Sequence, residues 1–411
     1  MSREGRPKRS LHGLPLRALL GALALASTVA GAARAQAAPA PTAPVVPGCS
    51  TAVAPAPQLA AEPDFIDGPL SPFGVAITAN SKTAFVADSA GAIYLYSLGS
   101  SKPATEKVDA FRVRPSSSGV PPLPGVSPTG LALTPNDRYL VAAWQGGAEV
   151  FEVGHLEGSR SGLSSWVTGT LRSSGEGAIE VAVSPDGGYV FVSLEDSNEL
   201  AVFNLTKALR DGFRSSDLVG TVPLGTAPVG IATAPDGRYL YVTSEATAQN
   251  QDEGTLTTIN LRRAELAPSH AIVSTVEAGC SPVRVAATST FVYVTARGSD
   301  ALLRFNASDL VRRPARALNG VVTVGEAPVG LALVHHDRTL VLSDSDRFAV
   351  AGQGASLAVV TTPSHGQMVL RGYIRADSFP RDMAASRNGK WLVVSNFGSS
   401  QVEAVKIQGL P

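Results

Sequence analysis

The chain repeats one pattern of apolar and polar residues seven times. Each copy opens on a Pro-x-Gly-like step, continues as a short apolar run, turns at a Pro-Asp-Gly-like tripeptide and ends in a second apolar run. The runs are rich in aromatic and β-branched residues, and dipeptides such as Asp236-Gly237 permit the positive φ of a tight hairpin. Each copy therefore predicts two antiparallel strands. The copies lie at 72–88, 128–144, 178–194, 228–244, 282–296, 328–344 and 380–396.

The third residue of each copy, called here its mouth position, sets the length of the repeat. Successive mouth positions are 46 to 56 residues apart, the length of a four-stranded propeller blade. After the last copy only one further strand, at 401–406, is evident, and residues 57–66 can supply the missing one. The sequence predicts an all-β, seven-bladed β-propeller with four-stranded antiparallel blades and a ring closed by strands from both termini. The mouth positions are Gly74, Gly130, Glu180, Gly230, Arg284, Gly330 and Asp382.

The N-terminal region departs from this pattern. Residues 1–35 join a basic stretch, an apolar run and the small residues Ala33 and Ala35, the layout of a secretory signal peptide. The apolar run is too short to span a bilayer comfortably, so we expect cleavage and no transmembrane segment afterwards. Residues 36–58 read as an Ala/Pro-rich linker and residues 59–411 as the propeller. The predicted location is periplasmic or extracellular.

Removing the leader changes the charge balance. The whole chain has 34 basic and 34 acidic residues. The predicted signal peptide, residues 1–35, holds six of the basic residues and one of the acidic ones. The rest of the chain therefore has 28 basic and 33 acidic residues and a net charge of −5. A mildly acidic protein is not expected to bind nucleic acid. The two cysteines, Cys49 and Cys280, can pair in an oxidising compartment, which would draw the N-terminal tract across one rim of the channel.

Charged mouth positions mark a candidate site. The first strand of a blade lies innermost and strand direction alternates, so mouth positions and the loops after the second strands share one rim. Four of the seven are glycine, which suits a crowded channel. Glu180, Arg284 and Asp382 would instead project charges into the mouth, with Arg381 beside them.

Three interpretations of these charges stay open. They can form a solvated salt-bridge ring without chemistry, or the two carboxylates can hold a divalent cation. Alternatively, an arginine orients an anionic substrate while a carboxylate acts as general base. No complete ligand set is visible, so no cofactor is predicted and a divalent cation is the metal to consider.

Two uncharged residues on the same rim complete the candidates. Trp144 could stack on a ring-shaped ligand or pack on a neighbouring blade, and Asn396 follows another second strand. The adjacent His335 and His336 replace the Pro-Asp of a turn and belong to the opposite rim, so we assign no metal ligand or catalytic residue. The ligand-binding candidates are Glu180, Arg284, Asp382, Arg381, Trp144 and Asn396.

The repeat resembles a known family. Tyr241-Val242-Thr243-Ser244 and Tyr293-Val294-Thr295-Ala296 resemble the motif of YVTN-repeat propellers, over about residues 72–408. The last copy, with FPRDMA at 379–384, is similar to the terminal blade of the lactonase family, which includes 6-phosphogluconolactonases. The resemblance implies a Pro-Arg-His motif at the start of a blade in enzymatic members. None of the seven blade starts contains a histidine, and Arg284 retains the arginine alone.

Two functions follow as expectations. The first is an exported, monomeric YVTN-type propeller that binds a small molecule, glycan or protein partner on one rim of the central channel. The alternative is a lactonase-like hydrolase that acts on a sugar lactone or related ester with Arg284, Glu180 and Asp382. The missing Pro-Arg-His motif favours the first, and the lactonase-like last blade supports the second.

Overall fold

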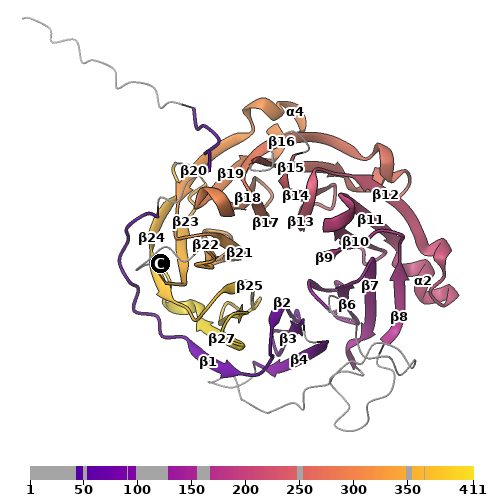
Figure 1. The fold of residues 1–411 in the computed structure, drawn as a ribbon, viewed down its shortest axis with the longest axis horizontal. Coiled ribbons are helices and arrows are strands. Elements are labelled where there is room, and N and C mark those ends of the chain that lie inside the picture. Colours follow the sequence, from indigo (N-terminus) through magenta and orange to yellow (C-terminus); the bar gives the residue numbers. More distant parts are fainter. Residues whose placement is uncertain are drawn as a thin grey trace, which may run out of the picture. The chain divides into compact units, whose positions relative to one another are not determined.

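The computed structural model describes residues 43–49, 53–89, 91–98, 128–154, 167–247, 253–348, 354–364 and 366–411. All belong to one compact unit, residues 43–411. The predicted signal peptide, 1–35, lies outside the described residues, and so do residues 36–42 and 50–52 of the predicted linker. Within the unit, seven β-sheets stand side by side in a ring (Figure 1). The predicted seven-bladed propeller is confirmed.

Each blade runs from an innermost to an outermost strand, and neighbouring strands are antiparallel. Blade 1 shows three strands, because the chain after its third strand, residues 99–127, lies outside the described residues. From the centre outward, the strands are β2 (Pro72–Ile77), β3 (Thr83–Asp88) and β4 (Ala92–Ser97) in blade 1; β5 (Leu131–Leu133), β6 (Tyr139–Trp144), β7 (Gly147–Glu152) and β8 (Val167–Arg172) in blade 2; β9 (Ala178–Val183), β10 (Tyr189–Leu194), β11 (Glu199–Asn204) and β12 (Leu218–Pro223) in blade 3; β13 (Thr226–Thr233), β14 (Tyr239–Ala246), β15 (Glu253–Asn260) and β16 (Ile272–Cys280) in blade 4; β17 (Pro282–Ala287), β18 (Phe291–Ala296), β19 (Ala301–Asn306) and β20 (Leu318–Thr323) in blade 5; β21 (Pro328–Val334), β22 (Thr339–Asp344), β23 (Ser356–Thr361) and β24 (Val369–Arg375) in blade 6; and β25 (Pro380–Ala385), β26 (Trp391–Asn396), β27 (Gln401–Lys406) and β1 (Asp64–Asp67) in blade 7.

Blade 7 joins the two ends of the propeller. Strand β1 pairs with β27, with Phe65 opposite Glu403 and Asp67 opposite Gln401. The closing strand was predicted within 57–66, and the structure starts it later, at Asp64. The preceding residues are used elsewhere, because Gln58 forms a parallel bridge to Tyr373 on the outer strand of blade 6.

The core lies between neighbouring blades. Second strands such as Tyr189–Leu194 and Phe291–Ala296 are almost wholly buried, because both faces of each sheet are covered by the next sheet. Phe85, Phe191 and Tyr241 are among their largest fully buried side chains. The predicted tight turns have the expected backbone, for Gly187, Gly237 and Gly389 have φ of 75, 67 and 68°.

Short helices follow the third strand of three blades. Each begins after an asparagine whose side chain accepts a backbone N–H of the first turn, as Asn204 does from Lys207 at 2.8 Å. Among the described residues no helix is long and apolar enough to cross a membrane. The α-helices are α2 (Leu205–Asp211), α3 (Leu261–Ala264) and α4 (Ala307–Arg312), and the 3-10 helices are Glu195–Ser197, Ser215–Asp217, Pro268–His270, Arg297–Ser299, Pro314–Arg316 and Ile407–Gly409.

An N-terminal strap, residues 43–49 and 53–62, leads into β1. A disulfide joins Cys49 to Cys280, at the end of β16. Beyond it the strap follows the outer strands of blades 5 and 6, where the Ala54 N–H donates to the Val324 carbonyl at 3.0 Å and the Leu59 N–H to the Tyr373 carbonyl at 2.7 Å. The expectation that this disulfide would draw the tract across the channel is wrong, because the outer strand of blade 6 offers it an unpaired edge (Figure 1).

Candidate functional site

The mouth positions lie at the crowded centre of the ring. In six blades a register shift between the first two strands falls at or beside the mouth position, as between Pro282 and Val285. A Cβ on Gly130 would lie 2.7 Å from the Cα of Glu180, and one on Gly230 would lie 3.0 Å from the Cα of Arg284. Glycine is therefore required where one mouth position abuts the next, and the central space is left to three longer side chains.

Hydroxyl groups on the second strands tie these positions together. The Arg284 N–H donates to Thr295 Oγ1 at 3.0 Å, and this hydroxyl donates at 2.9 Å to the carbonyl of Val329 in the next blade. Each such bond contributes about 1 kcal/mol net. Sequence reasoning missed this feature, although Ser or Thr recurs near the end of five second strands. The hydroxyls are those of Ser193, Thr243, Thr295, Ser343 and Ser395.

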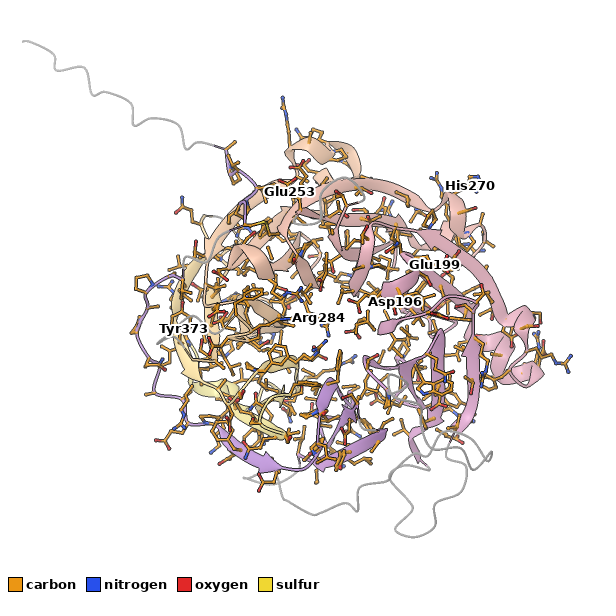
Figure 2. The ribbon with its side chains drawn as sticks, viewed as in Figure 1. Asp196, Glu199, Glu253, His270, Arg284 and Tyr373 are labelled. Carbon is orange, nitrogen blue, oxygen red and sulfur yellow. A yellow bond between two sulfur atoms is a disulfide. The ribbon has the colours of Figure 1, made fainter. Side chains whose placement is uncertain are left out.

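Glu180, Arg284 and Asp382 meet at the mouth from blades 3, 5 and 7. Arg284 Nη2 lies 3.2 Å from Glu180 Oε2, and Arg284 Nε lies 3.6 Å from Asp382 Oδ1. All three side chains are nearly buried: that of Arg284 is 8% exposed, that of Glu180 11% and that of Asp382 14%. Figure 2 shows Arg284 at the inner side of the ring, whereas His270 lies at its periphery. The structure thus brings together the three charged mouth residues named from the sequence.

Burial governs the electrostatics of this trio. Burial raises the pKa of Glu180 from 4.5 to about 7, and the positive charge of Arg284 only partly opposes this shift. For Arg284, burial alone would lower the pKa, but Glu180 and Asp382 outweigh it and raise the value. Backbone N–H groups complete the network, with Val75 donating to Asp382 Oδ2 at 3.0 Å and Val181 to Glu180 Oε1 at 3.1 Å. Arg284 is therefore held between two partners rather than left free.

Arg381, the neighbour of Asp382, has a different environment. Its guanidinium carbon lies 3.8 Å from the ring centre of Phe73, 5.4 Å from that of Phe397 and 5.7 Å from that of Phe379. These cation–π contacts hold the group in place without neutralising it. Its buried Nε has no hydrogen-bond partner among the described residues. Burial lowers the pKa of Arg381 to about 9, with Arg284, Arg347 and Arg297 acting in the same direction.

A cleft of about 570 Å³ opens beside Arg381 between blades 6 and 7. Arg347 lies on its wall, in the loop after β22, and the cleft is also lined by Phe379, Asp346 and Asp377. Burial, with a hydrogen bond to Glu326, raises the pKa of Asp346. Two arginines thus line this cleft.

The rest of this rim carries paired charges. Arg297 Nη2 lies 2.7 Å from Glu245 Oε2, so this arginine has its own carboxylate. Burial raises the pKa of Glu195, and repulsion from Glu245 and Asp196 adds to the shift. Of the four arginines around the mouth, Arg284 and Arg297 form ion pairs, whereas Arg347 and Arg381 form none with another described residue.

Trp144 and Asn396 lie apart from the charged trio. Trp144 is 7% exposed, lines a separate cleft in blade 2, and has the guanidinium of Arg172 over its ring at 5.6 Å. Asn396 is fully buried and its amide donates to Glu403 Oε2 at 3.0 Å within blade 7. Sequence position placed both residues at the rim, but their side chains pack against their own blades.

No metal site is evident in the described part of the chain. There, no group of three or more His, Cys, Asp and Glu side chains is placed to hold an ion. The positive charge between Glu180 and Asp382 is that of Arg284. His335 and His336 lie in the turn between β21 and β22, with φ of 53 and 56°, and His335 Nε2 lies 3.0 Å from the Ile407 carbonyl.

Comparisons with known proteins agree with this geometry. Residues 64–351 match the family described as "Lactonase, 7-bladed beta-propeller". No curated protein matches the sequence. Among solved structures, a chain in "Crystal Structure of Mitotic Checkpoint Complex" has a TM-score of 0.62 at 12% identity, covering 86% of this chain and 97% of that one. This likeness concerns the fold alone, and 1451 chains match, so the scaffold itself does not indicate an activity. Because the family match covers more than half of the sequence, the chain belongs to the seven-bladed lactonase β-propeller family.

Proposed function

We propose that the rim around Arg381 binds a small anionic molecule through a carboxylate or phosphate group. The observation that carries this proposal is that Arg381 and Arg347, which line one cleft, form no ion pair with another described residue. Arginine presents its donors in a fixed fork that suits bidentate binding of such groups. A bound anion would relieve the repulsion among the clustered arginines, which lowers the pKa of Arg381.

The phenyl rings around Arg381 support a binding role. Phe73 and Phe397 contact edge to face at 6.5 Å between ring centres, and Phe379 and Phe397 at 5.7 Å. They hold the guanidinium in one position before any ligand arrives, so little conformational entropy is lost on binding. The half-buried position of Arg381 also strengthens an interaction between opposite charges there.

Calorimetric titration with inorganic phosphate, citrate and gluconate tests this proposal. We expect at least one to bind, and Arg381→Met to weaken that binding by about tenfold or more, since a buried charged hydrogen bond is lost. Arg387→Met is the matched control, because this exposed arginine lies in the same blade at the turn between β25 and β26. If none of the three anions binds, or if both variants bind like the wild type, the anion site is wrong.

Lactone hydrolysis is the second candidate, favoured by one observation besides the family match. Glu180 has a raised pKa beside Arg284, whose Nε and Nη2 form no aligned hydrogen bond with a described residue. Glu180 would take the proton of an attacking water, and Arg284 would face the oxygen that gains negative charge.

Acid release from a panel of sugar lactones, such as glucono-1,5-lactone, tests this second candidate. Glu180→Gln should lower the rate by about 10²-fold or more. Glu149→Gln is the matched control, because this acid in blade 2 is also buried and its pKa is also raised, to about 7, by burial. Equal rates for the wild type, Glu180→Gln and Arg284→Ala would eliminate hydrolysis at this site.

We also propose that the protein is exported and works in a periplasmic or extracellular compartment. The disulfide between Cys49 and Cys280 supports this, because such bonds persist in oxidising environments. Cell fractionation with N-terminal sequencing of the purified chain tests the proposal. A mature N-terminus near residue 36 in an exported fraction is expected, and an intact Met1 in the cytosolic fraction would contradict it.

A further inference from the structure

The described structure has a second rim cleft, of about 750 Å³, beside blades 2 and 3. It is lined by the ends of β6 and β8, by the connection from β8 to β9, and by Asp196 after β10. It occupies in blade 2 the place that the anion cleft occupies in blade 6, between the end of a second strand and the connection after the fourth strand. Its residues take no part in the site at Arg381.

Hydrogen bonds fix the chain segment that forms one wall of this cleft. The Ser173 N–H donates to the Gly146 carbonyl at 3.1 Å, and the Ala178 N–H donates to the Gln145 carbonyl at 2.7 Å. Between them, the Glu176 N–H donates to Ser197 Oγ at 2.7 Å. The connection of residues 173–178 is therefore fixed at both ends and in its middle, so the cleft exists before a ligand arrives.

The guanidinium of Arg172 lies over the Trp144 ring at the edge of the cleft. Gly147 pairs with both Trp144 and Arg172 across the sheet, and without a side chain of its own it lets Arg172 reach over to the indole ring. Trp144 is buried, whereas Arg172 is exposed. Arg172 forms no ion pair with another described residue, which leaves its planar donors facing solvent.

The polar groups of the cleft identify the class of ligand. Arg172 supplies donors, Glu176 and Asp196 supply acceptors, and Gln145 and Ser174 supply both. Two carboxylates against a single arginine disfavour an anion, and Arg172 disfavours a cation. Hydroxyl groups, which donate and accept alike, match this mixture best. We propose that the cleft between blades 2 and 3 is a carbohydrate-binding site, independent of the anion site at Arg381.

Titration calorimetry with cellotetraose, xylotetraose, maltotetraose and chitotetraose tests the carbohydrate site. We expect at least one tetrasaccharide to bind with a Kd of about 1 mM or tighter. Arg172→Met and Asp196→Asn should each weaken that binding by about tenfold, the loss of one charged hydrogen bond. The second variant keeps the shape of the wall, so it decides the question if Arg172→Met fails to fold.

Two control variants make the result specific. Arg138→Met removes another exposed arginine of blade 2 that lies over an aromatic ring, Tyr139, but at the turn between β5 and β6. Arg381→Met removes the proposed anion site. Both should bind the tetrasaccharide like the wild type. Failure of all four sugars to bind the wild type would overturn the proposal, as would unchanged binding by both Arg172→Met and Asp196→Asn.

Discussion

Arg284 and Arg381 lie at the same channel mouth, yet the groups that surround their positive charges differ. Arg284 has two carboxylates within 4 Å, contributed by blades 3 and 7. Arg381 has three phenyl rings and no carboxylate partner among the described residues. A buried charge that is paired supports the structure, whereas a buried charge held by rings alone stays available to a ligand. The difference separates the structural centre of the mouth from its proposed binding edge.

Removing the paired arginine should have the largest effect. Arg284→Met leaves Glu180 and Asp382 buried without a cation and should lower the free energy of unfolding by about 3–5 kcal/mol, as for other buried pairs that lose one partner. Urea unfolding followed by circular dichroism measures the change. Arg284→Lys keeps the charge and should lose less. A loss below about 1 kcal/mol, the value of a surface ion pair, would show that the trio is solvated.

Opening the disulfide should have the next largest effect. Cys280 lies four residues before Arg284, and its bond to Cys49 spans 231 residues. The paired mutant Cys49→Ala with Cys280→Ala should lose about 2–4 kcal/mol of stability. Phosphate binding at Arg381 should persist, because blade 7 has no part in this bond. Loss of phosphate binding in a folded mutant would show that the two sides of the mouth depend on each other.

The pH dependence of stability tests Glu403, a buried acid that, unlike Glu180, has no ion-pair partner among the described residues. Glu403 is fully buried, and burial raises its pKa from 4.5 to about 7, with only Asn396 as side-chain donor. The folded state therefore binds more protons than the unfolded state between pH 4.5 and 7, so unfolding free energy should fall as pH rises through this window. The fall attributable to Glu403 is on the order of 2 kcal/mol.

Urea midpoints at pH 4.5, 6 and 8 measure this dependence. Glu403→Gln should flatten the profile, and the exposed control Glu62→Gln should leave it unchanged. A wild-type stability that rises from pH 4.5 to 7 would mean that salt-bridged acids dominate, and it would contradict the raised pKa of Glu403.

Removing the unpaired arginine should have the smallest effect on stability. Arg381→Met gives up cation–π contacts but also relieves desolvation and repulsion from other arginines, so the net change should stay within about 1 kcal/mol. The same substitution should weaken phosphate binding by about tenfold or more. A loss as large as that of Arg284→Met would mean that Arg381 is a structural residue and would remove the basis of the proposed function.

Much of this fold could be predicted because repetition encodes it. The seven copies fixed the blades, and Glu180, Arg284 and Asp382 met because they occupy the same position in three of them. The onset of β1 at Asp64 was missed, since residues 54–59 pair instead with the outer side of blade 6. Sequence pattern cannot show that an outer strand has a free edge.

The surroundings of single side chains could not be predicted. The rings around Arg381 come from Phe73 in blade 1 and from Phe379 and Phe397 in blade 7, far apart in the sequence. Trp144 was correctly placed near a rim, but the glycine gap that lets Arg172 cover it appears only in the strand register. Such contacts depend on rotamers and on the approach of distant segments, which spacing does not encode.

The most direct measurement of the central claim is a phosphate titration followed through the arginine Nε–H resonances of the isotopically labelled protein. The Arg284 and Arg381 signals can be assigned with Arg284→Lys and Arg381→Lys variants. Phosphate should shift the Arg381 resonance in a saturable manner and leave that of Arg284 in place. A saturable shift of the Arg284 signal with the Arg381 signal unmoved, or no shift of either, would contradict the claim that Arg284 is occupied by its ion pairs and Arg381 is available to a ligand.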